Sequence, residues 1–448
     1  MFSNKLYSRV FPTLLNLTLL ILLIGSAAIP SPVHADSVIT VATNADTIAP
    51  DGLCSLREAI TNANADAQTY NDCVGGSGND TIQFNDILGT ATITLDSSLP
   101  DITDIDGLTI NGGGDITVSG NNSYRITIVN SNVPLTLNGL TATNAKPVST
   151  SGGAIHNSGT LTITNSTFSN NNTVQGGAIY NNSGTLLITN SIFSGNSSGY
   201  GGAIASSGIT SIVNITNSVF SGNSSSSGSG GSGVYSEGTL TIRNSSFINN
   251  THPGGRGVIY NSQGTASISN STFSGNSSGS GSNNVGGIYN SNGPMTITNS
   301  TFSGNSTSGF GGSGDIYQLG SSSTLYLYNN ILANSAGGGD CRVDNGTVAG
   351  NNNLIEDAST ACGFTNNVNG NIIGSDPALG SLTGFPTYFP LLAGSPAIDT
   401  GNDAICTATP VSNTSQNGVT RPQGSHCDIG SYELNSPMYK LFLPLLLR

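Results

Sequence analysis

Short runs of alternating apolar and polar residues recur along the chain, and almost every run ends in Phe. Successive Phe residues lie 25, 27, 27, 26 and 29 positions apart. Alternation over so few residues predicts β-strand rather than helix, because neighbouring side chains of a strand point to opposite faces. The runs are LTITNSTF (161–168), LLITNSIF (186–193), VNITNSVF (213–220), LTIRNSSF (240–247), ASISNSTF (266–273), MTITNSTF (295–302) and LYLYNNIL (325–332).

A second short motif, of the form GGAIY, precedes each Phe by 12 to 15 residues. Its copies end at His156, Tyr180, Ala205, Tyr235, Tyr260 and Tyr289. Two or three short strands in every ~25 residues, separated by Gly, Asn and Ser, are typical of a parallel β-solenoid whose turns stack at ~4.8 Å. A β-propeller needs ~40 residues for each blade. The sequence therefore predicts an all-β solenoid.

Equivalent residues of a solenoid form columns along its axis, so the repeat also predicts the place of each position. Ile and Phe are expected to stack inward as the core. The Asn of the recurrent Asn-Ser pair is expected to form a buried ladder at a bend, because identical amides can donate to and accept from one another. These residues are Asn165, Asn190, Asn217, Asn244, Asn270 and Asn299.

One segment near the start of the chain is predicted to be helical. Ser55 and Glu58 form an S-x-x-E capping box, which is typical of a helix start. The open end of a solenoid exposes unpaired strand edges and apolar core, so we expect this helix to cover the first turn as a lid. Its apolar face consists of Leu56, Ala59, Ile60 and Ala63.

Six cysteines fall into three pairs of similar spacing. Pairing of nearest neighbours as structural disulfides is the economical interpretation for an exported chain, although the spacing leaves the connectivity open. The absence of a C-x-x-C motif argues against zinc or thioredoxin-like chemistry. The pairs are Cys54/Cys73, Cys341/Cys362 and Cys406/Cys427.

The start of the chain predicts export. Two basic residues precede an apolar run (10–24), and VHA (33–35) fits a small-x-small cleavage site, so we interpret residues 1–35 as a signal peptide. The alternative is an uncleaved membrane anchor, but a spanning helix needs ~20 apolar residues and this run is shorter. We therefore expect a secreted, extracellular or cell-surface protein.

The formal net charge of −13 argues against one class of partner. Affinity for nucleic acid depends on patches of Lys and Arg, and the chain has only 11 such residues. The remaining candidates are an extracellular glycan or a cell-surface protein, bound by a monomer.

Catalytic groups are scarce in the repeats. A hydrolase needs paired carboxylates, and a lyase needs a base with a cation or metal-binding acids. Between positions 141 and 314 the charged residues are Lys146, Glu237, Arg243 and Arg256. His156 and His252 are expected at the surface rather than in a catalytic role, and His426 adjoins Cys427.

Acidic residues gather elsewhere, in three groups. Two of them could supply Ca²⁺ ligands, but neither has EF-hand spacing, and we favour solvated loops over a metal site; no cofactor is expected. They are Asp340, Asp344, Glu356 and Asp357 around Arg342, and Asp101, Asp104 and Asp106. The third group could be catalytic, but we favour a buried ion-pair network that closes the second end of the solenoid; it comprises Asp399, Arg421, Asp428 and Glu433.

One column suggests a ligand surface. If the Ile residues of the GGAIY motifs point inward, the residues after them point outward by the two-residue alternation. Stacked Tyr side chains would then form an exposed stripe that suits a sugar or protein surface, since Tyr combines an apolar ring with a hydroxyl. The alternative is that covering turns bury the column. The Tyr residues are Tyr180, Tyr235, Tyr260, Tyr289 and Tyr317.

Three stretches resemble known exported bacterial families. The region with NADTIAPDGLCSLREAI, NDTIQF and GLTINGGG resembles the CSLREA N-terminal domain of exported β-helix proteins. The GGAIY and FSGN repeats are similar to the polymorphic outer-membrane-protein repeat of bacterial adhesins. PLLAGSPAIDTGND and RPQGSHCDIGSYE (390–433) resemble the choice-of-anchor Q region. The resemblance implies a right-handed parallel β-helix at the cell surface and no characterised reaction.

These observations divide the chain into five parts. They are the signal peptide (1–35), a CSLREA-type cap with the first turns (36–130), the parallel β-helix repeats (131–375), a disulfide-braced C-terminal cap similar to choice-of-anchor Q (376–434) and an apolar tail (435–448). The tail is either an attachment or sorting signal for the cell envelope or a last strand that docks on the solenoid. The expected function is adhesion or structural contact without catalysis; the alternative is a carbohydrate-active lyase or hydrolase of the pectate-lyase-like fold that uses the Asp340–Asp357 region.

Overall fold

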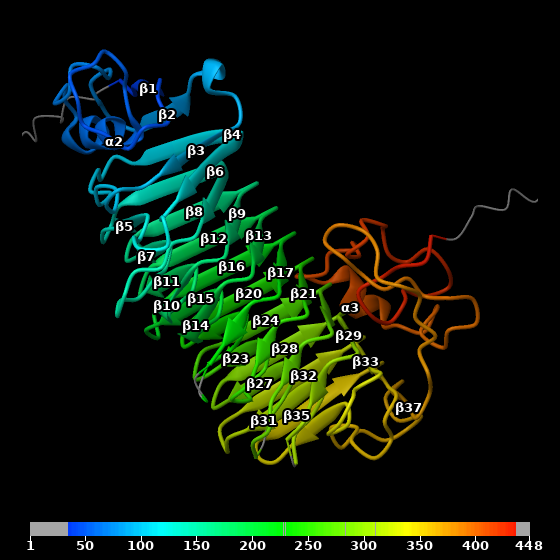
Figure 1. Ribbon diagram of the computed structural model, residues 1–448. Helices are drawn as coiled ribbons and strands as arrows, with labels where there is room; N and C mark the ends of the chain where they lie inside the picture. The colour runs from blue at the N-terminus through cyan, green and yellow to red at the C-terminus, as the bar shows by residue number, and fades with distance from the viewer. Residues whose placement is uncertain (1–34, 227, 229, 283, 310, 436–448) are drawn as a thin grey trace, which may run out of the picture.

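The computed structural model describes residues 35–435 except 227, 229, 283 and 310. Short parallel strands stack turn upon turn into a long solenoid, with a small helical lid at the N-terminal end and a C-terminal segment against one flank (Figure 1). This architecture confirms the predicted β-solenoid. The signal peptide and the apolar tail, apart from Ala35 and Asn435, lie outside the described residues.

The described strands form three parallel sheets. The first has 22 strands: β1 (Val38–Val41), β2 (Asp80–Phe84), β3 (Ala91–Thr94), β4 (Leu108–Ser119), β6 (Pro134–Thr143), β8 (Thr160–Thr164), β9 (Thr167–Ser169), β12 (Thr185–Thr189), β13 (Ile192–Ser194), β16 (Ile212–Thr216), β17 (Val219–Ser221), β20 (Thr239–Arg243), β21 (Ser246–Ile248), β24 (Ala266–Ser269), β25 (Thr272–Ser274), β28 (Pro294–Thr298), β29 (Thr301–Ser303), β32 (Thr324–Tyr328), β33 (Ile331–Ala333), β35 (Thr347–Asn351), β36 (Leu354–Ile355) and β37 (Ile372–Ile373).

The second and third sheets form the other walls of the solenoid. The second has six strands: β10 (Asn172–Gln175), β14 (Ser197–Tyr200), β18 (Ser224–Ser225), β22 (Thr251–His252), β26 (Ser277–Ser278) and β30 (Ser306–Thr307). The third has nine: β5 (Thr127–Val129), β7 (Ile155–Asn157), β11 (Ile179–Asn182), β15 (Ile204–Ser207), β19 (Val234–Ser236), β23 (Ile259–Asn261), β27 (Ile288–Ser291), β31 (Ile316–Leu319) and β34 (Cys341–Val343).

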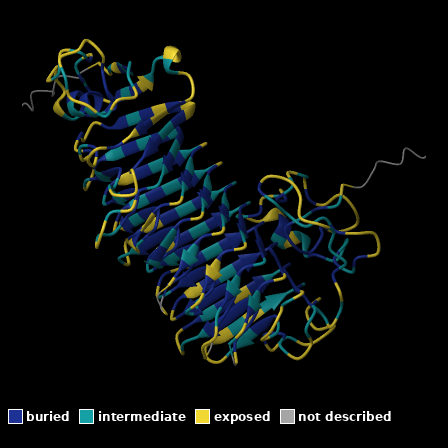
Figure 2. Cartoon of the chain, viewed as in Figure 1, coloured by how far each residue is buried: buried dark blue, intermediate teal, exposed yellow. Residues whose placement is uncertain are grey.

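The Phe column runs through the core as the repeat predicts. Phe168 pairs in register with Phe193, and Phe193 with Phe220. Their rings stack at 5.0 Å and 4.8 Å between centroids with planes nearly parallel, and Phe247, Phe273 and Phe302 continue the stack at 4.5–5.0 Å. Buried positions accordingly run along the strands, while exposed ones concentrate in the turns (Figure 2).

The N-terminal helix α2 (Leu56–Ala65) is the predicted lid. Ser55 Oγ accepts from the Glu58 N–H and Glu58 Oε2 accepts from the Ser55 N–H, so the capping box is complete. The four predicted apolar residues of its face are all buried, and Leu56 and Ile60 line the apolar interior together with Leu137 and Phe168. A Cys54–Cys73 disulfide attaches the helix to the loop that follows it.

The six Asn residues predicted to form a buried ladder do not form a buried column. Asn165 and Asn190 are exposed, Asn217 and Asn244 are half-buried, and Asn270 and Asn299 are buried because the C-terminal segment covers them. All six have φ between 46° and 51°. Asn recurs here because it tolerates the left-handed backbone conformation that the bend requires.

The buried amide ladder lies three residues after each Phe. Its members are 0% exposed, and the Nδ2 of each donates to the Oδ1 of the next at 2.9–3.0 Å. From the second member on, Nδ2 also donates to the backbone oxygen of a Phe one turn earlier. The physical argument for a ladder holds, but its residues are Asn171, Asn196, Asn223, Asn250, Asn276 and Asn305.

The C-terminal segment (376–435) does not close the second end of the solenoid. It contains α3 (Asp403–Thr407) and lies along the flank beside β17, β21, β29 and β33 (Figure 1). Thr272 Oγ1 donates to Gln416 Oε1 at 2.6 Å, and Ser431 N donates to Thr301 Oγ1 at 2.9 Å. Polar side chains at the outer bends of the solenoid therefore hold the segment, together with a buried apolar cluster. That cluster joins Leu391, Ala397 and Ile429 of the segment to Ile331, Ala333 and Leu354 of the solenoid.

Candidate functional site

The Tyr column exists, but most of it is not exposed. Tyr235, Tyr260, Tyr289 and Tyr317 pair in register. Tyr180 and Tyr235 are half-buried, whereas Tyr260, Tyr289 and Tyr317 are only 7%, 1% and 0% exposed. The prediction of a continuous exposed aromatic stripe is therefore wrong for the last three residues.

Side chains from other segments cover the buried rings. Val285, in the connection before β27 (279–287), packs with the buried Tyr rings. The Arg256 guanidinium lies 5.2 Å above the Tyr260 ring and 4.7 Å above the Tyr289 ring, and supplies cation–π contacts.

The hydroxyls of the column also have partners within the protein. Tyr235 donates to Glu237 Oε1 and Tyr317 donates to Asp344 Oδ2, each at 2.6 Å. Burial and these carboxylate contacts raise the pKa of both hydroxyls. The column is therefore mainly a packing element of the third sheet.

The acidic group near Cys341 is engaged in local structure. Asp340 is 1% exposed, and its Oδ2 accepts from the Asp357 N–H. Asp344, directly after β34, forms an ion pair with Arg342 of that strand, and this contact lowers the pKa of Asp344. Glu356 Oε2 accepts from the Asn334 N–H. Asp340, Asp344 and Glu356 thus each have a partner within the protein, and the Cys341–Cys362 disulfide braces this region.

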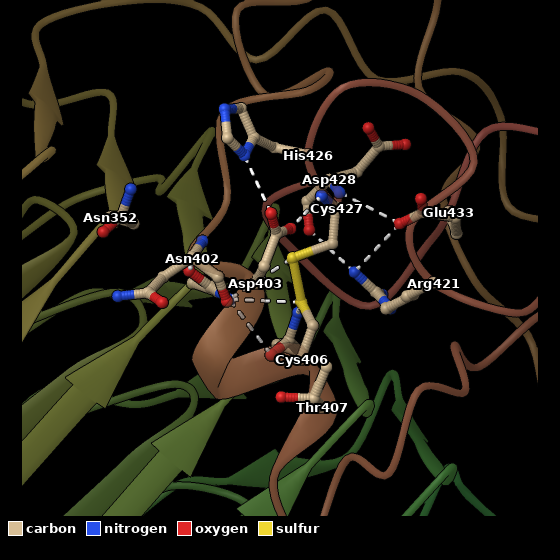
Figure 3. Close-up of a disulfide and its surroundings, with 12 residues drawn as sticks. Asn352, Asn402, Asp403, Cys406, Thr407, Arg421, His426, Cys427, Asp428 and Glu433 are labelled. Atoms are coloured by element: carbon tan, nitrogen blue, oxygen red, sulfur yellow. Dashed lines mark hydrogen bonds and ion pairs between the residues drawn. A yellow bond between two sulfur atoms is a disulfide. The ribbon is translucent and has the colours of Figure 1, made fainter.

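The C-terminal charged group forms the predicted buried network, on the flank rather than at the end (Figure 3). Arg421 donates to the backbone oxygens of Asp428 and Gly430, and its Nη1 lies 3.4 Å from Glu433 Oε2. Burial lowers the pKa of Arg421 to about 10. Asp399 contributes its N–H, which donates to Asp428 Oδ1. The group stabilises the segment, and the Cys406–Cys427 disulfide lies next to it.

The three histidines in the described part of the chain have different surroundings. His156 is half-buried and packs edge-on against Tyr180. His252 is fully buried and its Nδ1 accepts from the Gly255 N–H, so the expectation that it lies at the surface is wrong. His426 is exposed, and its Nδ1 lies 2.8 Å from Asp403 Oδ2.

The acidic group near the N-terminus differs from the one predicted. Asp104 and Asp106 lie close to Asp66, the C-cap residue of α2, whereas Asp101 is not part of the cluster. The sequence gives no sign of this, because Asp66 and Asp104 are brought together only by the docking of the helix.

A cleft of about 690 Å³ lies between the flank of the solenoid and the C-terminal segment. One wall carries three of the Asn residues that were predicted to be buried, namely the exposed Asn165 and Asn190 and the half-buried Asn217. The other wall carries Phe385 and Tyr388. An aromatic ring facing a column of amides combines an apolar contact with repeated hydrogen-bonding groups.

A hairpin positions the aromatic wall. Thr383 and Tyr388 exchange backbone hydrogen bonds at 3.0 Å and 2.8 Å, and Phe385 at its tip is 62% exposed. The backbone oxygen of Thr387 accepts from Ser246 Oγ and from Gln416 Nε2. The hairpin is thus fixed to the solenoid, while the Phe385 ring at its tip stays largely exposed to solvent.

Two comparisons bear on the identity of the chain. Residues 106–273 match the family model for the right handed beta helix region. The search of curated proteins finds no match. The match agrees with the parallel stack of turns described above and gives the solenoid its hand; the resemblances to CSLREA, choice-of-anchor Q and the adhesin repeat stay predictions.

Sequence reasoning missed both walls of the cleft. Phe385 lies just before the stretch that resembles choice-of-anchor Q (390–433), so the resemblance does not include it. The Asn residues at the bend were predicted to be buried. The cluster of aromatic residues in a Pro- and Gly-containing stretch, TGFPTYF (383–389), was the available sign.

Proposed function

We propose that the protein is an extracellular contact protein, adhesin-like or structural, that binds a glycan in the flank cleft without transforming it. The observation that carries the proposal is that the exposed Phe385 lines the same cleft as the amides of Asn165, Asn190 and Asn217. Sugars present apolar faces and rows of hydroxyls, so ring and amides together suit them.

The solenoid supports binding of a chain rather than of a single sugar. Equivalent residues of successive turns repeat at ~4.8 Å, so the column offers the same donor and acceptor at regular intervals. The three disulfides fit an oxidising compartment outside the cytoplasm. Among the described residues, no helix has the length and apolar character needed to cross a membrane.

Glycan-array binding and calorimetry on the purified protein test the proposal. Phe385→Ala is expected to weaken binding at least about fivefold, since an exposed aromatic contact contributes ~1 kcal/mol. Tyr326→Ala is the matched control, because Tyr326 is an exposed aromatic residue (39%) on the first sheet, outside the cleft. Equal loss in both variants, or no glycan bound at all, contradicts the proposal.

A second experiment with the same glycan tests the enzymatic alternative. Incubating the protein with the glycan it binds and measuring new reducing ends or unsaturated products distinguishes the two functions. Depolymerisation would contradict the contact function and favour a carbohydrate-active lyase or hydrolase.

A further inference from the structure

Three carboxylates meet where the helical lid touches the first turns of the solenoid. Asp66 ends α2, while Asp104 and Asp106 belong to the loop before β4, and each offers an oxygen within 4.8 Å of the others. Asp66 and Asp106 are exposed, whereas Asp104 lies beneath them and is 4% exposed. The cluster is therefore open to solvent on one side and has a buried carboxylate at its base.

The buried carboxylate has an unused oxygen. Asp104 Oδ1 accepts from the Asp106 N–H at 2.9 Å, but Oδ2 is buried and has no hydrogen-bond donor among the described residues. An unsatisfied buried carboxylate oxygen is costly. A cation at the cluster would satisfy it.

The electrostatic surroundings point the same way. Burial, together with the nearby carboxylates of Asp66 and Asp80, raises the pKa of Asp104 to about 6. Asp80 is itself fully buried with an unpartnered Oδ2, and Asp66 is among the charges that act on it. Like charges held this close repel one another unless a positive charge lies between them.

We propose that Asp66, Asp104 and Asp106 bind a Ca²⁺ ion that clamps the helical lid to the solenoid. Ca²⁺ takes oxygen ligands at ~2.3–2.6 Å, so one ion reaches oxygens separated by the distances found here. Water completes the six to eight ligands that Ca²⁺ prefers.

The lid is already tied to the same loop by Asn64. Its Oδ1 accepts from the Thr103 N–H at 2.9 Å, and its Nδ2 donates to the Asp101 backbone oxygen at 2.7 Å. These bonds hold the helix end and the loop in register before the ion binds. Ca²⁺ then raises the stability of the lid by binding the folded state alone.

Calorimetry with CaCl₂ and thermal unfolding of the EDTA-treated full chain test the site. Three carboxylates with few further ligands predict a Kd of ~0.1–1 mM, as in extracellular Ca²⁺ modules. We expect ~5 mM Ca²⁺ to raise the unfolding midpoint by at least about 2 °C, and to protect the lid from proteolysis. No binding up to 10 mM, or an equal response to Mg²⁺, overturns the proposal.

Two variants separate the site from general effects of acidic residues. Asp104→Asn is expected to lose the Ca²⁺ response while unfolding without Ca²⁺ at the same or a higher temperature than the wild type, since it removes a repelled carboxylate. Asp101→Asn is the control, because Asp101 is exposed, near in sequence and outside the cluster. An equal Ca²⁺ response in the two variants overturns the proposal.

Discussion

Asn305 Nδ2 donates to Asp315 Oδ1 at 2.8 Å, and this bond ends the buried amide ladder. Each earlier Asn of the ladder donates to the next Asn, so the last one needs an acceptor that no further repeat supplies. Asp315 provides that acceptor and is 0% exposed. Asp340 occupies the equivalent position one turn later, because the residues that follow Asp315 and Asp340, Ile316 and Cys341, pair in register. Asp340 is also buried.

This arrangement predicts a pH-dependent stability. Burial raises the pKa of Asp315 well above its usual value, and the charge of Asp340 adds to the shift. A raised pKa in the folded state contributes stability that is complete below the unfolded pKa of ~3.9 and is lost as the pH rises through the folded value. Asp315→Asn keeps the acceptor oxygen, and should unfold at pH 8 at the same or a higher temperature than the wild type.

Thermal unfolding between pH 4 and pH 8 checks this expectation. The midpoint of the wild type should fall with rising pH more than that of Asp315→Asn. The exposed Asp86→Asn serves as the control and should follow the wild type. A variant with the same pH slope as the wild type would show that Asp315 does not cause the dependence.

The Asn column before each Phe and the buried ladder after it are expected to differ in their sensitivity to substitution. Asn223 Oδ1 accepts from both the N–H and Nδ2 of Asn196, and its Nδ2 donates to the Phe193 backbone oxygen. Asn223→Gly leaves these buried groups unpaired and should lower the free energy of unfolding by ~2–5 kcal/mol. Asn217→Gly should change it by less than ~1 kcal/mol, because Asn217 has φ 49° and Gly adopts that conformation freely.

Urea denaturation of the two Gly variants measures the difference. Gly costs little backbone entropy at position 217, where φ is positive, and about 0.5–1 kcal/mol at position 223, so a larger difference between the variants reports the side chains. Similar losses at positions 217 and 223 would contradict the assignment of the ladder to the column that follows Phe.

The Phe column could be predicted from the sequence, whereas the choice between the two Asn columns could not. Phe168 and its equivalents recur with a period of one turn, and large apolar side chains have only the interior to occupy. Every repeat, however, carries an Asn before its Phe and one after it, and only the backbone decides which is buried. A left-handed φ at Asn165 turns that side chain to solvent.

Contacts between distant segments account for the other differences. Tyr289 is buried because Val285, in the connection that precedes its strand, packs with it, and the alternation of the strand contains no information about that connection. The cleft depends on pairs such as Thr272 and Gln416, which are 144 residues apart. The capping box of α2 was predictable because both of its residues lie within one helical turn.

Substitutions in the Tyr column are expected to lower the free energy of unfolding more at its buried end than at its half-buried end. Tyr289→Ser removes a ring that is 1% exposed and packs against Tyr260, Tyr317 and Arg256. We expect a loss of ~3–5 kcal/mol, as for other large-to-small core substitutions. Tyr180→Ser should lose less than half as much, because Tyr180 is half-buried. Equal losses in urea denaturation would contradict the burial gradient.

Arg421 predicts how the C-terminal segment is held. Its guanidinium is buried and donates to the backbone oxygens of Asp428 and Gly430. Arg421→Met leaves Glu433 without its countercharge and the two oxygens without a donor. Removing one partner of a buried ion pair costs ~3–5 kcal/mol, so the segment should detach from the flank while the solenoid stays folded.

Limited proteolysis with mass spectrometry measures that detachment. Arg421→Met should be cut within 376–435 at least about tenfold faster than the wild type, while fragments of the repeats resist. Arg342→Ala is the matched control, because its ion pair with Asp344 is about one-third exposed and such pairs contribute only ~0–1 kcal/mol. Uniform cleavage along the whole chain would contradict this prediction, because it would mean that the segment and the solenoid unfold together. The hydrogen bonds from Thr272, Thr301 and Asn329 would then couple them as one cooperative unit.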